Sequence, residues 1–130
     1  MRILVVDDDR DYLGLLANQL QARGHDVFSA VNGKEARELL DIEHADLIVS
    51  DVFMPTLDGI WFHSYVREFS NVPDIPFVFI TCRDDTPPRD LVVNPSVDLS
   101  LSKTLGMGDL VGRIESFSNA AKAEAKAAGT

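Results

Sequence analysis

Short apolar runs alternate with helical patterns along this chain, and this alternation constrains the fold more than any other feature. Residues 3–6 form a continuous apolar run, as expected of a strand that is buried on both faces. The next segment is helical in pattern, because Leu13, Leu16, Ala17 and Leu20 recur at helical spacing. Strands that alternate with helices imply right-handed crossovers and a parallel sheet covered on both faces. The sequence therefore predicts an α/β fold.

Five strands are expected. The first four are residues 3–6, 27–30, 47–49 and 76–81. In residues 97–101 apolar and polar side chains alternate, which is typical of a half-exposed strand at the edge of a sheet.

About five helices are expected between and after these strands. Gly24 lies where the first helix would end, and Asn32 and Asp58 precede the second and third helices. The apolar positions of the third helix are predicted to be Ile60, Val66 and Phe69.

The end of the chain is less regular. Between residues 83 and 96, Pro87, Pro88 and Pro95 restrict the fourth helix to a short or irregular one. A last helix is expected at residues 105–117. Residues 118–130 are rich in alanine and lysine, and we expect a tail or an extension of that helix. The predicted domain is therefore residues 1–117.

Composition excludes several classes of function. A chain of 130 residues fits one domain, and its net charge of -9 disfavours binding to nucleic acid or to anionic membranes. No apolar run approaches the roughly 20 residues of a membrane span, and Met1 leads directly into a strand rather than a signal peptide. The single cysteine, Cys82, forms no intramolecular disulfide and fits a reducing cytoplasm. We therefore expect a small acidic cytoplasmic domain.

Polar side chains gather where the predicted strands end. Asp7, Asp8 and Asp9 follow the first strand, and Asp51 follows the third. Because ligands of open parallel sheets bind beyond the carboxyl ends of the strands, these carboxylates are expected at one site. Carboxylates that lie together repel one another unless a cation is present, and oxygen ligands of this kind suit Mg²⁺.

Two further residues complete the predicted site. Thr81 ends the fourth strand and supplies a hydroxyl donor, and Lys103 follows the fifth strand and supplies a fixed positive charge. Carboxylates, a divalent metal, an ammonium and a hydroxyl together are suited to phosphoryl transfer onto a carboxylate.

At these residues the chain resembles a response-regulator receiver domain, and in particular the single-domain regulators of chemotaxis. The resemblance runs from Met1 to about Phe117 and rests on the motifs VVDD at residues 5–8, DVFMP at 51–55 and LDG at 57–59, with Thr81 and Lys103. It implies a flavodoxin-like three-layer sandwich with a parallel sheet in the order 2-1-3-4-5.

The resemblance also implies a metal site. Asp8 and Asp51 would bind Mg²⁺ directly, with Mn²⁺ as a possible substitute. The backbone carbonyl of Phe53 would be a third protein ligand, and Asp7 would act mainly through metal-bound water.

Asp51 would be the phosphoacceptor. Lys103 would pair with Asp51 or its phosphoryl group, and Thr81 would move toward that group on activation. The implied donor is a sensor histidine kinase or a phosphotransfer protein, and the implied output is contact with a target protein or a second copy of the chain. Such a domain is not an enzyme, although it assists its own phosphorylation and dephosphorylation.

The segment from Thr81 to Lys103 departs from the family pattern. Thr104 replaces the usual proline after the lysine, so the intervening peptide bond is expected to be trans. Ser100 occupies the position that is commonly aromatic, and Cys82 replaces a small residue after the threonine. These changes leave the chemistry of the site intact but alter the elements through which the family usually signals.

Three alternatives remain open. The first is a receiver-like scaffold that docks a partner without being phosphorylated. The second is an aspartate-nucleophile phosphatase of the haloacid-dehalogenase type, although residues 7–11 do not match its Asp-x-Asp motif with a nearby threonine. The third is a flavin or nucleotide binder, in which three carboxylates after the first strand would repel the phosphate.

The remaining notable residues are given structural roles. Asp9 and Asp11 are interpreted as favourable charges at a helix N-terminus, Cys82 as a small buried residue and Trp61 as helix packing. None of the three histidines is expected to be a phosphorelay residue, since all lie at predicted loop or helix-surface positions. They are His25, His44 and His63.

Overall fold

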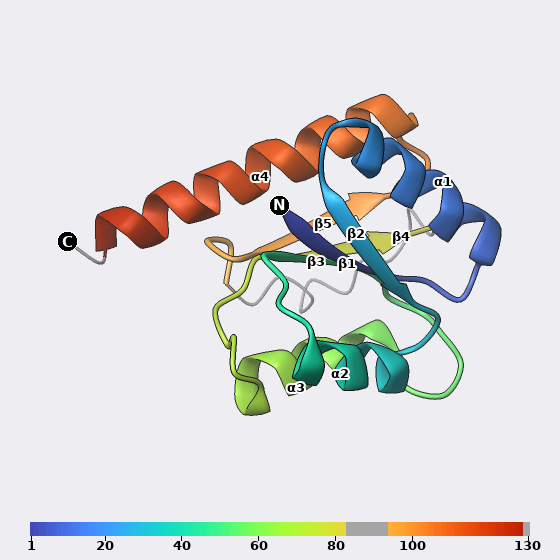
Figure 1. The fold of residues 1–130 in the computed structure, drawn as a ribbon, viewed down its shortest axis with the longest axis horizontal. Helices are drawn as coiled ribbons and strands as arrows, with labels where there is room; N and C mark the ends of the chain where they lie inside the picture. Colours follow the sequence, from blue (N-terminus) through green and yellow to red (C-terminus); the bar gives the residue numbers. More distant parts are fainter. Residues whose placement is uncertain (83–93, 129–130) are drawn as a thin grey trace.

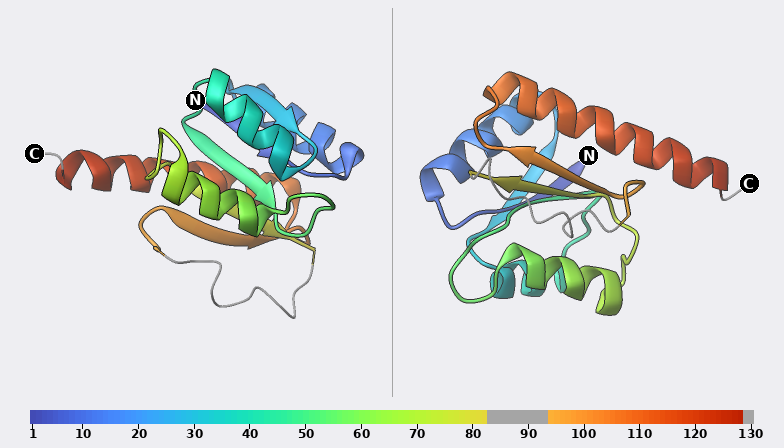
Figure 2. Two further views of the ribbon diagram at one scale, coloured as in Figure 1. Left: turned by 90° about the horizontal axis from the view of Figure 1, so that it is seen from below. Right: turned by 180° about the vertical axis from the view of Figure 1, so that it is seen from behind.

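A five-stranded parallel sheet lies between two layers of helices in the computed structural model, which describes residues 1–82 and 94–128 (Figures 1 and 2). The strand order is β2-β1-β3-β4-β5, so the predicted sheet and its order are confirmed. The strands are β1 (Arg2–Val6), β2 (Asp26–Ala30), β3 (Leu47–Asp51), β4 (Phe77–Thr81) and β5 (Asp98–Ser102).

Four helices cover the sheet within the described residues. They are α1 (Arg10–Ala22), α2 (Gly33–Ile42), α3 (Gly59–Phe69) and α4 (Met107–Ala128). Helices α2 and α3 cover one face, and α1 and α4 cover the other (Figure 1). The additional short helix predicted around the prolines falls on residues 83–93, which lie outside the described residues.

The sheet divides the core into two clusters because alternate strand residues point to opposite faces. Leu4 and Val6 of β1 pack toward α2 and α3, whereas Ile3 and Val5 pack toward α1 and α4. All of these side chains are fully buried. The continuous apolar runs of the sequence therefore mark strands that contact helices on both sides.

Polar caps begin the first three helices, close to the positions where the sequence predicts these helices to start. The side chains of Asp9, Asn32 and Asp58 each accept hydrogen bonds from backbone N–H groups in the first turn of α1, α2 and α3. Gly24 has a φ of 90° just beyond α1, a conformation that glycine adopts without strain. Local sequence thus fixes where these helices start and where α1 stops.

The buried face of α3 differs from the prediction. Ile60 is 39% exposed and Phe69 is 75% exposed, while Phe62, His63 and Val66 are buried. His63 was expected at a loop or helix-surface position, and that expectation is wrong. Its ring packs edge-on against Phe77, with 4.9 Å between ring centres.

His63 is buried because β5 offers it a polar partner. His63 Nε2 lies 2.8 Å from Oδ1 of Asp98, a buried residue at the start of the edge strand. Arg67 Nη2 donates to the same oxygen at 2.6 Å. Burial would raise the pKa of Asp98, but the hydrogen bonds with His63 and Arg67 outweigh it and lower that pKa. This cluster ties α3 to β5.

The structure also tests two further expectations, one about the burial of Cys82 and one about the tail after residue 117. Cys82 is exposed rather than buried, because it follows the last residue of β4 and leaves the sheet. Residues 118–128 continue α4 as one helix, whose end projects beyond the sheet (Figures 1 and 2). Ser118 and Ala121 are still buried against the body.

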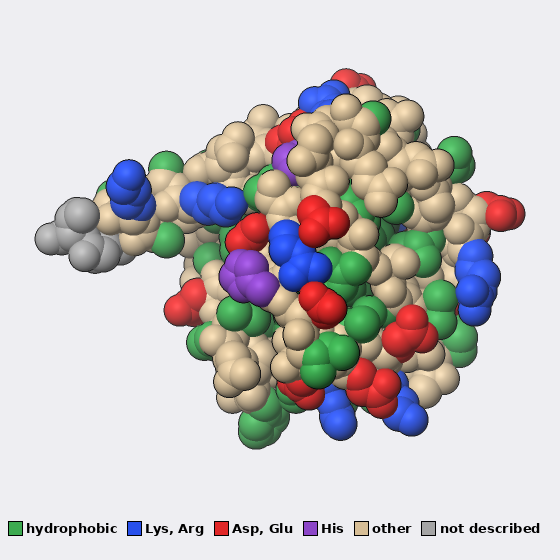
Figure 3. All heavy atoms as spheres, viewed as in Figure 1, with side chains coloured by type: hydrophobic (Ala, Val, Ile, Leu, Met, Phe, Trp, Pro, Cys, Tyr) green, Lys and Arg blue, Asp and Glu red, His purple; other side chains and the backbone are tan. Residues whose placement is uncertain are grey.

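The described part of the chain has no helix that is both long and apolar enough to span a membrane. On the face seen in Figure 3, Lys and Arg side chains lie among Asp and Glu side chains rather than in an extended basic patch. That mixture agrees with the net charge of -9.

Candidate functional site

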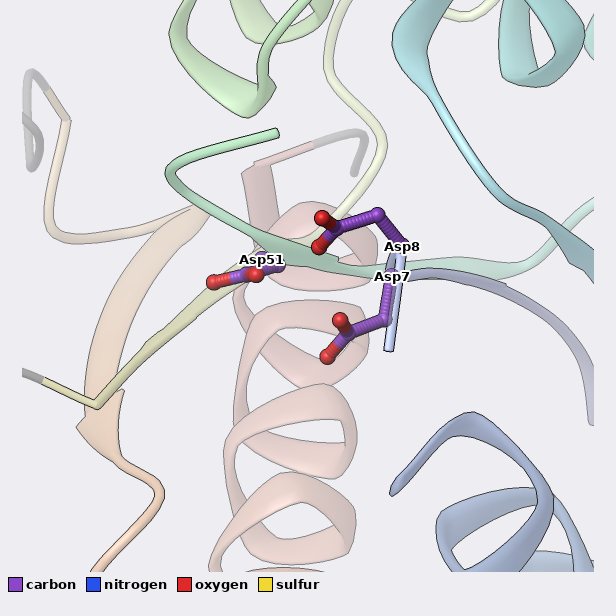
Figure 4. A group of neighbouring side chains, drawn as sticks. All are labelled: Asp7, Asp8 and Asp51. Atoms are coloured by element: carbon purple, nitrogen blue, oxygen red, sulfur yellow. The ribbon is translucent and has the colours of Figure 1, made fainter. Parts of the chain in front are cut away.

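Three aspartates converge beyond the carboxyl ends of two neighbouring strands. Asp7 and Asp8 follow β1, and Asp51 is the last residue of β3, which pairs with β1. Oxygen atoms from all three carboxylates lie within 4.8 Å of one another (Figure 4). Asp7 and Asp51 are buried, whereas Asp8 is exposed. The cluster is therefore open to solvent at Asp8.

Lys103 is the cation of this cluster. Its Nζ lies 2.6 Å from Oδ2 of Asp7 and 3.5 Å from Oδ2 of Asp51. The backbone N–H of Lys103 donates to the carbonyl of Thr81 at 2.8 Å, so the start of the loop after β5 is held against the end of β4. The sequence predicted a contact with Asp51, and the structure adds a closer one with Asp7.

Burial and mutual repulsion control the protonation of the site. Burial, followed by the charge of Asp7, raises the pKa of Asp51 to about 6. Burial also raises the pKa of Asp7. Burial lowers the pKa of Lys103, but its hydrogen bond to Asp7 and the charge of Asp51 outweigh burial and raise it. The site therefore favours the charged ammonium of Lys103 and disfavours the charged carboxylates of Asp7 and Asp51.

The backbone fixes the direction of each aspartate. Asp7 Oδ1 accepts a hydrogen bond from the N–H of Asp9 at 2.9 Å, and Asp51 Oδ1 accepts one from Val52 at 2.9 Å. Gly59 packs directly on the strand end, because a Cβ there would lie 2.0 Å from the carbonyl oxygen of Asp51. Only glycine fits that contact, and it brings the start of α3 to the site.

Thr81 and Phe53 lie at the same end of the sheet as the three aspartates. Thr81 is the buried last residue of β4, next to β3 in the sheet. Phe53 lies two residues after Asp51, with its side chain 46% exposed beside the strand end. Thr81 ends a strand and Phe53 follows one, at the carboxyl ends of the strands where the aspartates meet.

The three carboxylates fit a hard divalent cation. They offer only oxygen ligands, and burial together with the charge of Asp7 raises the pKa of Asp51 despite the nearby ammonium of Lys103. One exposed carboxylate beside two buried ones would leave room for the waters that Mg²⁺ retains. The residues that could hold this cation are Asp8 and Asp51, together with the backbone carbonyl of Phe53. Asp7 could contribute through water.

One residue of the site was missed at the sequence level. Lys103 Nζ lies 4.5 Å from the centre of the Tyr12 ring, in the first turn of α1. Tyr12 precedes Leu16 by one helical repeat, so it could have been assigned to the buried face of α1. The lysine that contacts it is 91 positions away, and no local pattern connects the two.

The departures from the family pattern have structural counterparts. Ser100 lies on β5 in register with Phe79, and no aromatic side chain is present at that position. None of the peptide bonds in the described ranges is cis, so the bond between Lys103 and Thr104 is trans as expected. Thr104 instead forms a hydrogen bond with Ser102, with 2.7 Å between the hydroxyl oxygens.

Comparison with known proteins identifies similar chains. The family model described as the response regulator receiver domain matches residues 3–115. "Response regulator MprA" of Mycobacterium leprae is 35% identical over 117 residues, which are 90% of this chain and 50% of that protein. "Probable transcriptional regulator ycf27" of Porphyridium aerugineum is 32% identical over 88% of this chain and 47% of its own length. The chain thus spans about half the length of these curated relatives.

Solved structures show the same fold. A CheY-like receiver domain protein from Methanospirillum hungatei has a TM-score of 0.83 and 22% identity, and the match covers 95% of this chain and 97% of that one. Response regulator TrrA of Thermotoga maritima, solved in complex with Mg²⁺-BeF, has a TM-score of 0.78 and 25% identity. That match covers 89% of this chain and 97% of the other.

Proposed function

The chain belongs to the response-regulator receiver domain family, and on this premise we propose that it accepts a phosphoryl group on Asp51. The proposal rests mainly on one observation, namely that the buried Asp51 lies beside the buried Asp7, the exposed Asp8 and the ammonium of Lys103. The donor is a phosphohistidine of a sensor histidine kinase or a phosphotransfer protein. We place both proteins in the cytoplasm.

The residues of the site have complementary roles in the transfer. A carboxylate oxygen of Asp51 attacks the phosphorus, and the bond from phosphorus to the donor imidazole breaks as the new oxygen–phosphorus bond forms. The ammonium of Lys103, already 3.5 Å from Asp51, neutralises charge on the phosphoryl oxygens. The hydroxyl of Thr81 then turns toward the phosphoryl group.

A divalent metal completes the charge balance of the site. Asp8 and Asp51 would hold Mg²⁺ directly, together with the backbone carbonyl of Phe53, and Asp7 would act through water. When bound, the metal neutralises charge on the phosphoryl oxygens during transfer. Mn²⁺ is an acceptable substitute because it also prefers oxygen ligands.

The output of the domain is a change in protein contacts. Phosphorylation of the domain alters its contact with a target protein or with a second copy. The usual aromatic residue is replaced by Ser100, so the signal is transmitted without reorientation of an aromatic side chain. The domain assists its own phosphorylation and dephosphorylation but turns over no separate substrate.

Phosphorylation with a small donor tests the proposal. Wild-type chain incubated with acetyl phosphate and Mg²⁺ should gain the mass of one phosphoryl group, and removal of Mg²⁺ with EDTA should abolish the gain. Asp51→Asn should gain nothing under either condition. Beryllofluoride with Mg²⁺ should shift the NMR signals of residues around Asp51 in the wild type only.

The opposite result would favour a docking scaffold. If the wild type neither gains a phosphoryl group nor responds to Mg²⁺ and beryllofluoride, the acidic cluster is structural. The chain would then be a receiver-like scaffold that is not regulated by phosphorylation.

A further inference from the structure

Among the described residues, three side chains of the site lie close to the ammonium of Lys103. Its Nζ lies 2.6 Å from Asp7 Oδ2, 3.5 Å from Asp51 Oδ2 and 4.5 Å from the centre of the Tyr12 ring. Only 13% of the lysine side chain is exposed. The aromatic ring is thus a contact of a largely desolvated cation, the setting in which a cation–π interaction is strongest.

Tyr12 is held in place by its backbone and by the packing of its ring, and not by its hydroxyl. Its backbone N–H donates to Oδ1 of Asp9, the cap of α1, at 3.2 Å. Its ring is partly buried and packs against the core cluster between the sheet and helices α1 and α4, as do Leu105 and Met107. The hydroxyl is buried and forms no hydrogen bond with any described residue. The ring is therefore the part of Tyr12 that has a partner.

An aromatic face suits a lysine whose ammonium interacts with the carboxylate oxygens of both Asp7 and Asp51. Lysine has a flexible four-carbon stem, so its ammonium needs lateral support to remain over the site. A ring attracts the ammonium electrostatically without accepting a directed hydrogen bond. The N–H donors thus remain available for the oxygens of Asp7, of Asp51 and of a group bound to Asp51.

We propose that Tyr12 is a positioning residue for Lys103, and that its ring holds the ammonium over Asp51 during phosphoryl transfer. This inference rests on the proposed function, because it assigns Tyr12 a role in that reaction. Tyr12 acts through Lys103 and does not touch the phosphoryl group itself. The ring is required, and the hydroxyl is dispensable.

The inference is tested by two substitutions at position 12. Tyr12→Leu keeps an apolar side chain but removes the ring, and should slow phosphorylation by acetyl phosphate between about 2-fold and 30-fold. Tyr12→Phe keeps the ring and should restore the wild-type rate to within about twofold, because the lost hydroxyl has no described partner. Tyr65→Leu is the matched control, since it removes the other tyrosine from α3 on the opposite face of the sheet.

A double-mutant cycle shows whether Tyr12 acts through Lys103. In a Lys103→Met background, Tyr12→Leu should cause no further loss of rate. The NMR chemical shifts of Lys103 provide a second measurement, which a general loss of stability would not change. The ring should shift the ε-methylene protons of Lys103 upfield in the wild type and in Tyr12→Phe, but not in Tyr12→Leu.

The possible failures are distinguishable. If the wild type accepts no phosphoryl group, the proposed function fails, and any role of Tyr12 in it fails as well. If the wild type is phosphorylated and Tyr12→Leu is equally fast, the inference alone is overturned. A further loss caused by Tyr12→Leu in the Lys103→Met background would also overturn it, because the effect would then be structural.

Discussion

Burial gives neighbouring aspartates different roles at the scale of the residue. Asp7 is fully buried beside Lys103, Asp8 faces solvent, and Asp9 is the cap of α1. Asp51 is buried where its charge is opposed by Asp7 and only partly balanced by Lys103. The same type of side chain is therefore a helix cap at Asp9, while Asp8 and Asp51 have the surroundings that suit the metal ligand and the nucleophile proposed above.

The raised pKa of Asp51 predicts that this residue destabilises the metal-free chain at pH 7. Its pKa of about 6 in the folded chain exceeds the ordinary value of 3.8. A raised carboxylate pKa contributes stability fully below pH 4, and that stability is lost as the pH rises through 6. In EDTA, Asp51→Asn should therefore raise the free energy of unfolding by about 1–3 kcal/mol at pH 7 and have little effect at pH 4.

Urea denaturation at the two pH values measures this difference. The control is Asp74→Asn, which removes an exposed carboxylate from the loop before β4. Added Mg²⁺ should stabilise the wild type more than Asp51→Asn, because a ligand stabilises the state that binds it. A metal-free Asp51→Asn chain that is less stable than the wild type at pH 7 would contradict the prediction.

At the scale of the element, close contacts between helices and strand ends build the site. The start of α3 packs on the end of β3 through Gly59, and a polar cluster of His63, Arg67 and Asp98 ties the same helix to β5. Helix α3 thereby connects β3, which ends in Asp51, with the edge strand β5. A substitution at Gly59 should therefore change the position of Asp51.

Two glycine substitutions of the same kind should have opposite effects. Gly59→Ala would place a Cβ 2.0 Å from the backbone oxygen of Asp51, so the strand or the helix must shift. We expect a loss of about 2–3 kcal/mol in the free energy of unfolding, and slower phosphorylation. Gly14→Ala, on the exposed side of α1 with no atom within 4 Å of the new Cβ, should gain about 0.5–1 kcal/mol.

Thermal or urea unfolding of Gly59→Ala and Gly14→Ala measures these two changes in the free energy of unfolding. Equal effects of the two substitutions would mean that the contact between Gly59 and Asp51 does not constrain the fold.

At the scale of the whole molecule, the projecting end of α4 is separable from the site. The side chains of residues 122–127 are exposed, and Ser96 Oγ donates to Glu124 at 3.0 Å. Ser118 and Ala121, by contrast, are buried. We propose that the folded receiver unit ends close to the predicted boundary at residue 117, with the next helical turn packed against it.

Truncation should reveal this boundary. A chain that ends after Ala121 loses residues 122–127, whose side chains are exposed, so its free energy of unfolding should fall by less than about 1 kcal/mol and its phosphorylation should be unchanged. A chain that ends after Phe117 also loses two buried residues and should be less stable by about 1–3 kcal/mol. Loss of folding in the longer of these chains would show that the domain extends farther along α4.

The sequence by itself determined the alternation of elements, the helix caps and the residues at the strand ends. These features follow from interactions between residues close in the chain, such as helical periodicity, capping and the continuous apolar runs of buried strands. The resemblance to the family added the strand order. Asp51, Asp8, Thr81 and Lys103 could be found in this way because each follows or ends a recognisable strand.

Only the tertiary structure decided which side chains meet. His63 is buried because Asp98 lies across from it, Cys82 is exposed because the chain leaves the sheet there, and Lys103 contacts Asp7 and Tyr12 as well as Asp51. Each of these environments depends on elements that are distant in the sequence and are brought together by packing. Local sequence patterns do not identify partners that are distant in the chain. The contacts of these side chains could therefore be assigned only from the tertiary structure.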